Sequence, residues 1–145
     1  MDKPKFVYVT YINTTPERLW TALTSGDFTE KYWFGSRIQS EWKVGSPLKI
    51  LTGVADKDWQ GEVLQCDPPR LLSYNFRVSG GSAHVSRVVF QLEQHGPVMK
   101  LTLTHDELDE KDDKFLAGIS GGWPAVLSNL KSLLEGGHPL VPSPC

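Results

Sequence analysis

The sequence predicts one α+β domain, in which a seven-stranded antiparallel sheet curves around a long C-terminal helix. Three observations support this fold. Short runs rich in β-branched and aromatic residues follow one another at hairpin spacing between residues 35 and 105, and no helical pattern interrupts them. The longest amphipathic stretch comes after the last run, and two short helical patterns follow the first one. A sheet with one apolar face must bury it, and the final helix offers the only apolar stripe of matching length.

The strands are bounded by turn residues. Residues 5–12 form the first predicted strand, and a Thr-Thr-Pro-Glu sequence at 14–17 begins the first short helix with a threonine cap and a proline in its first turn. The second short helix runs into Tyr32, Trp33 and Phe34. The six further strands are expected near 36–42, 47–53, 58–66, 71–78, 83–93 and 98–105, separated by segments rich in Gly, Pro and Asp.

The final helix has an apolar residue at every third or fourth position, but its first half contains residues that disfavour helix. Gly118, Gly121 and Gly122 precede Trp123, and Pro124 follows it. Each glycine costs up to about 1 kcal/mol and an interior proline about 3 kcal/mol. Two interpretations remain open: a thin, bendable segment that leaves space over the sheet, or a helix that begins at Pro124. The periodic residues are Phe115, Ile119, Trp123, Val126, Leu130 and Leu133.

Length, charge and cysteine content narrow the function classes. The 145 residues suffice for one domain with a core that needs neither disulfides nor metals. The net charge of −2 without a basic block does not favour nucleic-acid binding. Phe6–Val9 is too short for a signal peptide or a spanning helix, so no membrane insertion is expected. Two cysteines, Cys66 and Cys145, make no disulfide framework, and we expect a reduced, cytoplasmic protein. Residues 1–137 are expected to form the single domain and 138–145, with three prolines, a flexible tail.

Four segments resemble one known family. They are TTPERLW at 14–20, GEVLQCDPPRLL at 61–72, LTLTH at 101–105 and GWP with its following leucines at 122–130. In this order and spacing they are similar to the bacterial homologues of the Hsp-90 ATPase activator, within the START-like (SRPBCC) superfamily. The resemblance implies the helix-grip fold with a hydrophobic cavity between sheet and helix. It leaves the activity open, because the superfamily includes lipid carriers, hormone receptors, polyketide cyclases and chaperone regulators.

Strand alternation predicts a mostly apolar wall with polar groups near its ends, which is typical of a small-molecule pocket. The alternative is an ordinary core with a polar rim. An empty void of about 300 Å³ would cost about 7 kcal/mol, so such a space must be hydrated, occupied or filled by aromatic side chains. The expected wall consists of Trp20, Trp33, Trp59, Tyr74, Phe76, Phe90, Leu101, Ile119, Trp123 and Leu127, with polar contacts from His84, Ser86 and His105.

Three functions follow from these observations. The first is binding of a small hydrophobic or amphipathic ligand in the cavity. The second is a cyclase- or hydrolase-like reaction there, for which His105 with Tyr74 would be the acid or base. The third is a chaperone-regulating module with a protein partner. No residues are assigned as catalytic, and no cofactor or metal is expected, because no Cys or His pair has zinc spacing. His105 and Asp106 are neighbours on one strand and point to opposite faces, so they do not form a dyad.

Overall fold

The structure, a computed structural model, describes residues 5–33, 35–52, 58–78, 85–108 and 113–137. It contains the seven strands and three helices that the sequence predicts, and the α+β fold is confirmed. In chain order they are β1 (Phe6–Ile12), α1 (Pro16–Thr24), α2 (Gly26–Tyr32), β2 (Arg37–Ser40), β3 (Pro47–Leu51), β4 (Trp59–Asp67), β5 (Leu71–Val78), β6 (Ser86–His95), β7 (Val98–Asp106) and α3 (Asp113–Gly136).

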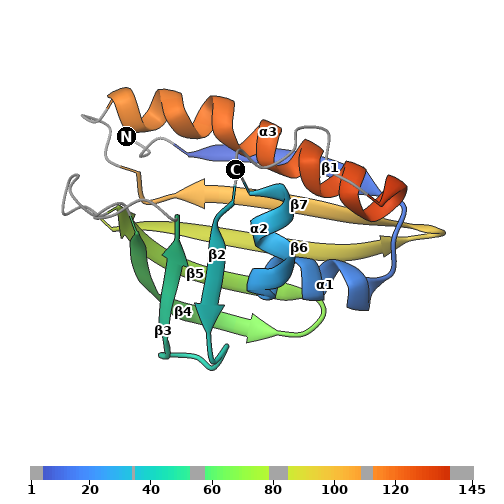
Figure 1. The fold of residues 1–145 in the computed structure, drawn as a ribbon, viewed down its shortest axis with the longest axis horizontal. Helices are drawn as coiled ribbons and strands as arrows, with labels where there is room; N and C mark the ends of the chain where they lie inside the picture. Colours follow the sequence, from blue (N-terminus) through green and yellow to red (C-terminus); the bar gives the residue numbers. More distant parts are fainter. Residues whose placement is uncertain (1–4, 34, 53–57, 79–84, 109–112, 138–145) are drawn as a thin grey trace.

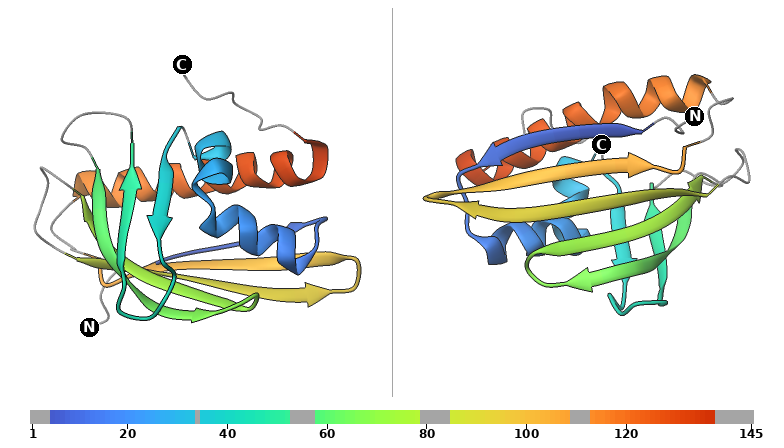
Figure 2. Two further views of the ribbon diagram at one scale, coloured as in Figure 1. Left: turned by 60° about the horizontal axis from the view of Figure 1, so that its bottom comes forward. Right: turned by 180° about the vertical axis from the view of Figure 1, so that it is seen from behind.

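The strands form one antiparallel sheet in the order β1-β7-β6-β5-β4-β3-β2. Each strand from β2 to β6 pairs with the next strand along the chain, and β7 also pairs with β1. The sheet curves, and α3 crosses its concave side (Figure 1). Helices α1 and α2 lie on that same side (Figure 2, left). This arrangement is the helix-grip fold.

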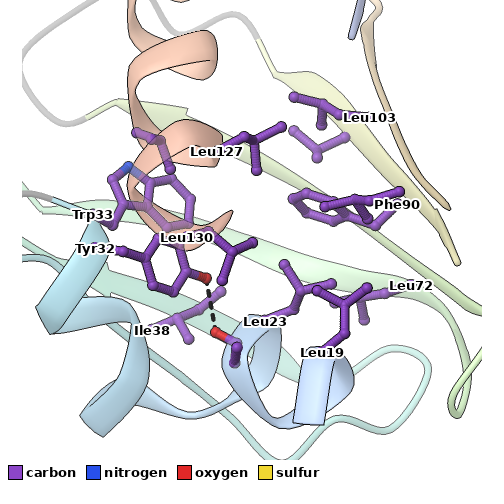
Figure 3. Close-up of a cluster of buried hydrophobic side chains, with 14 of the residues drawn as sticks. Leu19, Leu23, Tyr32, Trp33, Ile38, Leu72, Phe90, Leu103, Leu127 and Leu130 are labelled. Atoms are coloured by element: carbon purple, nitrogen blue, oxygen red, sulfur yellow. Dashed lines mark hydrogen bonds between the residues drawn. The ribbon is translucent and has the colours of Figure 1, made fainter. Parts of the chain in front are cut away.

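The core lies between the concave face and the three helices. In β7 every second residue is buried, from Met99 to His105, as strand alternation predicts. Figure 3 shows Leu127 and Leu130 of α3 directed toward this face, where Phe90 and Leu103 lie. Among the inward residues of the sheet are Tyr74, Phe76, Ser86, Phe90, Leu101 and His105, which strand alternation placed on this face.

The sequence predicted the start of α1 correctly, whereas one of its two interpretations of α3 is wrong. Helix α1 begins as expected, since the Thr15 hydroxyl accepts a 3.2 Å hydrogen bond from the Arg18 N–H and Pro16 lies in the first turn. Helix α3 instead runs from Asp113 to Gly136 with Pro124 inside it. The interpretation that this helix begins at Pro124 is wrong, because burial of Trp123 and Leu127 against the sheet outweighs the unfavourable helix propensity.

Strand β2 is shorter than predicted. It ends at Ser40, because Trp42 takes up a left-handed backbone conformation with φ of 59° in the turn before β3. In the part of the chain that the structure describes, no helix has an apolar stretch long enough to cross a bilayer.

Candidate functional site

An aromatic cluster, consisting of Trp33, Trp59, Phe76, Phe90 and Trp123, lies between the sheet and the middle of α3. Trp33 follows α2 and contacts Trp59 and Trp123, with ring centroids 6.4 and 5.2 Å apart. Trp59 stacks on Phe76 at 4.7 Å, and Phe90 meets Trp123 edge to face at 6.1 Å. Such contacts are favourable beyond the area that they bury. Residues distant in the sequence are thereby joined at one end of the core.

A chain of polar side chains adjoins this cluster. The indole N–H of Trp123 donates a 3.0 Å hydrogen bond to Nδ1 of His105, and Nε2 of His105 lies 2.8 Å from the Ser86 hydroxyl oxygen. The His105 side chain is fully buried, and Ser86 is 3% exposed. The residues lie on α3, β7 and β6, and the pairing of Val88 with His105 sets Ser86 diagonally across from the histidine.

The geometry determines which nitrogen of His105 carries the proton. An indole N–H can only donate, so Nδ1 must be the acceptor and must lack a proton. Neutral His105 then has its proton on Nε2 and donates to Ser86. Burial lowers the pKa of His105 to about 4, against a smaller opposing effect of the Asp106 carboxylate. The imidazole is therefore neutral at pH 7 and points a donor at the serine.

With this hydrogen-bond direction, the hydroxyl proton of Ser86 remains available for a second hydrogen bond. Its oxygen accepts from His105, and the hydroxyl proton remains able to donate. Among the described residues, none accepts a hydrogen bond from Ser86. A serine hydroxyl has both a donor and an acceptor capacity. Ser86 pairs with Phe76 across β5 and β6, and the ring of Phe76 lies 5.4 Å from that of His105.

Tyr74 supplies a second polar group with capacity to bond. It lies on β5 opposite Val88, two residues along the strand from the Phe76–Ser86 pair. The side chain is 1% exposed, its ring contacts Phe76 and Phe90, and its hydroxyl makes no hydrogen bond within the described part of the chain. Burial raises the pKa of Tyr74 well above its usual value. The phenol is therefore un-ionised at neutral pH.

The other predicted wall residues take different places. Leu101 and Leu127 are buried in the core. Trp20 packs partly buried against the core from α1 but makes no ring contact with another aromatic residue of the described ranges. His84 lies outside the described residues. Ile119 is part of α3, but its side chain is likewise outside them.

The arrangement bears on the catalytic hypothesis for His105 and Tyr74. The two side chains are not hydrogen-bonded to each other, since His105 is held by Trp123 and Ser86. His105 Nε2 already carries its proton, so it cannot deprotonate Ser86. The site is thus arranged to donate hydrogen bonds. In the described ranges, no group of three His, Cys, Asp or Glu side chains is placed to hold a metal ion.

Two residues near the site were not predicted. Trp42 packs against Tyr74 with ring centroids 6.5 Å apart and is held in a conformation with φ of 59°. No sequence signal indicates this, because bulky residues rarely adopt positive φ. Tyr32 belongs to the buried interior, and its hydroxyl donates a 2.7 Å hydrogen bond to the carbonyl of Ala22 (Figure 3).

Comparison with solved structures places this architecture among known ones. The solution structure of the Aha1 dimer from Colwellia psychrerythraea is 24% identical with a TM-score of 0.79, and covers 92% of this chain and 98% of its own. A crystal structure from Mesorhizobium loti is 26% identical with a TM-score of 0.78, over 90% and 96% of the two chains. A crystal structure described as an HSP90 activator from Plasmodium falciparum is 21% identical with a TM-score of 0.75, over 93% and 97%.

The sequence matches no curated protein, but it matches a family model that agrees with the structural comparison. The family model described as Activator of Hsp90 ATPase homolog 1-like protein matches residues 13–135, which span α1 to α3. This chain belongs to that family, within the START-like superfamily.

Proposed function

We propose that the domain binds a small, uncharged and mostly apolar molecule between the sheet and α3, and that this molecule accepts a hydrogen bond from Ser86. The observation that carries the proposal is the direction of the Trp123–His105–Ser86 hydrogen bonds. They leave the buried serine with a donor that the described residues do not use. A buried hydroxyl whose proton meets no acceptor forgoes a hydrogen bond, so an acceptor bound beside it would be stabilised.

The neighbouring groups indicate the chemistry of the molecule. Rings of Trp33, Trp59 and Phe76 offer apolar surface, which suits a flat or cyclic hydrophobic body. The Tyr74 hydroxyl provides a further polar contact on the strand beside Ser86. A charged molecule is disfavoured, because the burial that already keeps His105 neutral would also penalise the charge of a ligand at this place.

The test compares two probes of almost equal shape. 2-Acetylnaphthalene carries a carbonyl acceptor, and 2-ethylnaphthalene does not. We expect saturable shifts of the Trp123 indole N–H signal in NMR titrations, with the ketone binding about 2- to 10-fold more tightly, the value of one hydrogen bond. In Ser86→Ala the ketone should lose this advantage. If neither probe gives a saturable shift, the proposed interior site is wrong.

A matched serine controls for general effects of removing a buried hydroxyl. Ser73 is 1% exposed, and its hydroxyl donates a 3.0 Å hydrogen bond to the carbonyl of Val88. Ser73→Ala should retain the preference for the ketone. A preference that survives in Ser86→Ala, or disappears in Ser73→Ala, would contradict the role given to Ser86.

A second candidate function is regulation of an Hsp90-type chaperone. Its support is the family match over residues 13–135 and the likeness in fold to the structure described as an HSP90 activator. Such a function would use the surface, and the close ring contacts of the interior are compatible with it. Titration with a purified Hsp90 would then shift signals of exposed residues and raise the ATPase rate. The Trp123 indole signal should stay unchanged, which distinguishes this function from interior binding.

A further inference from the structure

The two edges of the sheet are built differently. At one edge, β2 is four residues long and begins with Arg37, which pairs with Asp27 and Glu30 of α2. A short strand, charges and a covering helix are the features by which proteins prevent an edge from pairing. At the other edge, β1 has seven residues without charge or proline, in unbroken register with β7. This edge lacks those sequence features.

The exposed side chains of β1 are apolar. Val7 is 49%, Val9 45% and Tyr11 47% exposed, all on the outer face of the sheet. Figure 2 (right) shows β1 as the outermost strand on that side. Large apolar residues in a row on one exposed strand are unusual for a face that meets only water, and such patches mark contact sites.

The hydrogen bonds of α3 show which backbone groups face away from β7. Lys131 donates to the carbonyl of Tyr11 at 2.5 Å, and the Glu135 carboxylate accepts from the N–H of Asn13 at 2.8 Å. Because successive residues of a strand point their backbone groups to opposite sides, those of Val7 and Val9 also face the outer edge. Side chains of α3 thus occupy the end of this edge at Tyr11, and no hydrogen bond to the edge groups of Val7 or Val9 occurs within the described ranges.

We propose that β1 pairs antiparallel with β1 of a second copy of this chain, about a two-fold axis at Tyr8. In this register Val7 lies opposite Val9 of the partner subunit, and Phe6 lies opposite Thr10 of the partner subunit. The pairing joins β-branched and aromatic residues across the strands, which is a favourable arrangement, and places no like charges together. It uses the backbone N–H and C=O groups of Val7 and Val9 that face away from β7. The hydrogen bonds of Lys131 to Tyr11 and of Glu135 to Asn13 are retained.

The sequence of the strand favours a second copy over a different partner. The segment FVYVT at 6–10 has an aromatic residue at its centre and a valine on either side, so a two-fold axis at Tyr8 brings like apolar groups together. A two-fold contact of this kind is closed, and it is the commonest form of soluble oligomer. The strand carries no charged side chain with which a dissimilar partner could be selected.

The first test is the mass in solution over a concentration series, by analytical ultracentrifugation. The expected result is a reversible change from the 16.2 kDa chain to a species of twice that mass. Val9→Lys should weaken the dimer at least about tenfold, since each lysine would enter the apolar pairing. Val44→Lys is the control, because Val44 is 70% exposed on the loop between β2 and β3. A monomer at every concentration, or a dimer that Val9→Lys leaves unchanged, would overturn the proposal.

The second test reads the register from disulfide formation. With Cys66 and Cys145 changed to serine, Val7→Cys and Val9→Cys proteins should cross-link faster when mixed than either does alone. Faster cross-linking of Val9→Cys alone would refute an axis at Tyr8, and no cross-linking in any sample would refute pairing of β1. Both substitutions lie on exposed positions, so circular dichroism should show folded proteins. The outcome does not depend on the interior site.

Discussion

The two ends of the core differ in how far their buried polar side chains are hydrogen-bonded. At the helical end, Tyr32 donates to the carbonyl of Ala22 at 2.7 Å, Asn129 donates to the carbonyl of Tyr32 at 3.3 Å, and Thr29 accepts from the Ile38 N–H at 3.1 Å. At the aromatic end, Tyr74 has no hydrogen bond within the described ranges and Ser86 uses only its oxygen. These polar side chains are all buried, with at most 3% of each exposed.

This contrast separates stability from binding. Fully bonded polar groups fix how α1, α2 and α3 meet, because each lost bond would leave a buried group unpaired. Unused donors in an aromatic surrounding contribute nothing comparable to the empty protein. We infer that the helical end contributes more to the stability of the fold than the aromatic end, where the ligand is proposed to bind.

The largest expected effect is a loss of stability in acid through His105. Burial holds its folded pKa near 4, below its ordinary 6.5. As the pH falls from about 6.5 to 4, the unfolded chain binds a proton that the folded chain does not, so the free energy of unfolding should fall by about 3 kcal/mol. Urea unfolding at a series of pH values measures this.

The control for this experiment is His105→Gln, whose side chain does not titrate but can still donate and accept. Its stability should change less between pH 6.5 and 4 than that of the original protein. Equal pH dependence of the two proteins would show that His105 is not the group responsible.

The next largest effect is expected from removing the Tyr32 hydroxyl at the helical end. Tyr32→Phe removes the donor to the Ala22 carbonyl and leaves a buried acceptor unpaired, so the free energy of unfolding should fall by about 1–3 kcal/mol. Thermal and urea unfolding would measure it. A change below about 0.5 kcal/mol would mean that the helical end does not depend on this bond.

A smaller effect of opposite sign is expected in α3. A Cβ added at Gly122 would meet no atom within 4 Å, so Gly122→Ala should gain helix propensity without a clash. The expected gain is up to about 1 kcal/mol in the free energy of unfolding. Gly61→Ala is the contrasting control, because its Cβ would lie 1.7 Å from the Asn75 carbonyl oxygen. Destabilisation by Gly122→Ala would show that the open space closes in solution.

The smallest effect on stability is expected from Tyr74→Phe, which tests most directly whether the two ends of the core differ. Tyr74→Phe removes a hydroxyl that has no hydrogen-bond partner among the described residues, so the empty protein should change by less than about 0.5 kcal/mol. Binding of 2-acetylnaphthalene should nevertheless weaken if the phenol contacts it. A loss of stability as large as that of Tyr32→Phe would show that the two ends do not differ.

The fold followed from the sequence because alternation and periodicity report on burial directly. Alternation placed Ser86 and His105 on the same face of neighbouring strands, and the structure brings them together at 2.8 Å. The bond from Trp123 to His105 could not be predicted, because the position of α3 along the sheet depends on how the two surfaces pack. The same packing overrides the local preference of Pro124. The conformation of Trp42 has no local signal at all.

Helix α3 also has a consequence for the rate at which the interior opens. Pro124 cannot donate a backbone hydrogen bond, so the ladder of the helix is interrupted between its two halves. The half before it contains Gly121 and Gly122, whereas the half after it carries the buried Leu127, Leu130 and Leu134. We expect the backbone amides around Gly121 and Gly122 to exchange with solvent faster than those around the buried Leu127 and Leu130. The ligand proposed above would then enter or leave beside this part of α3, without unfolding of the rest of the domain.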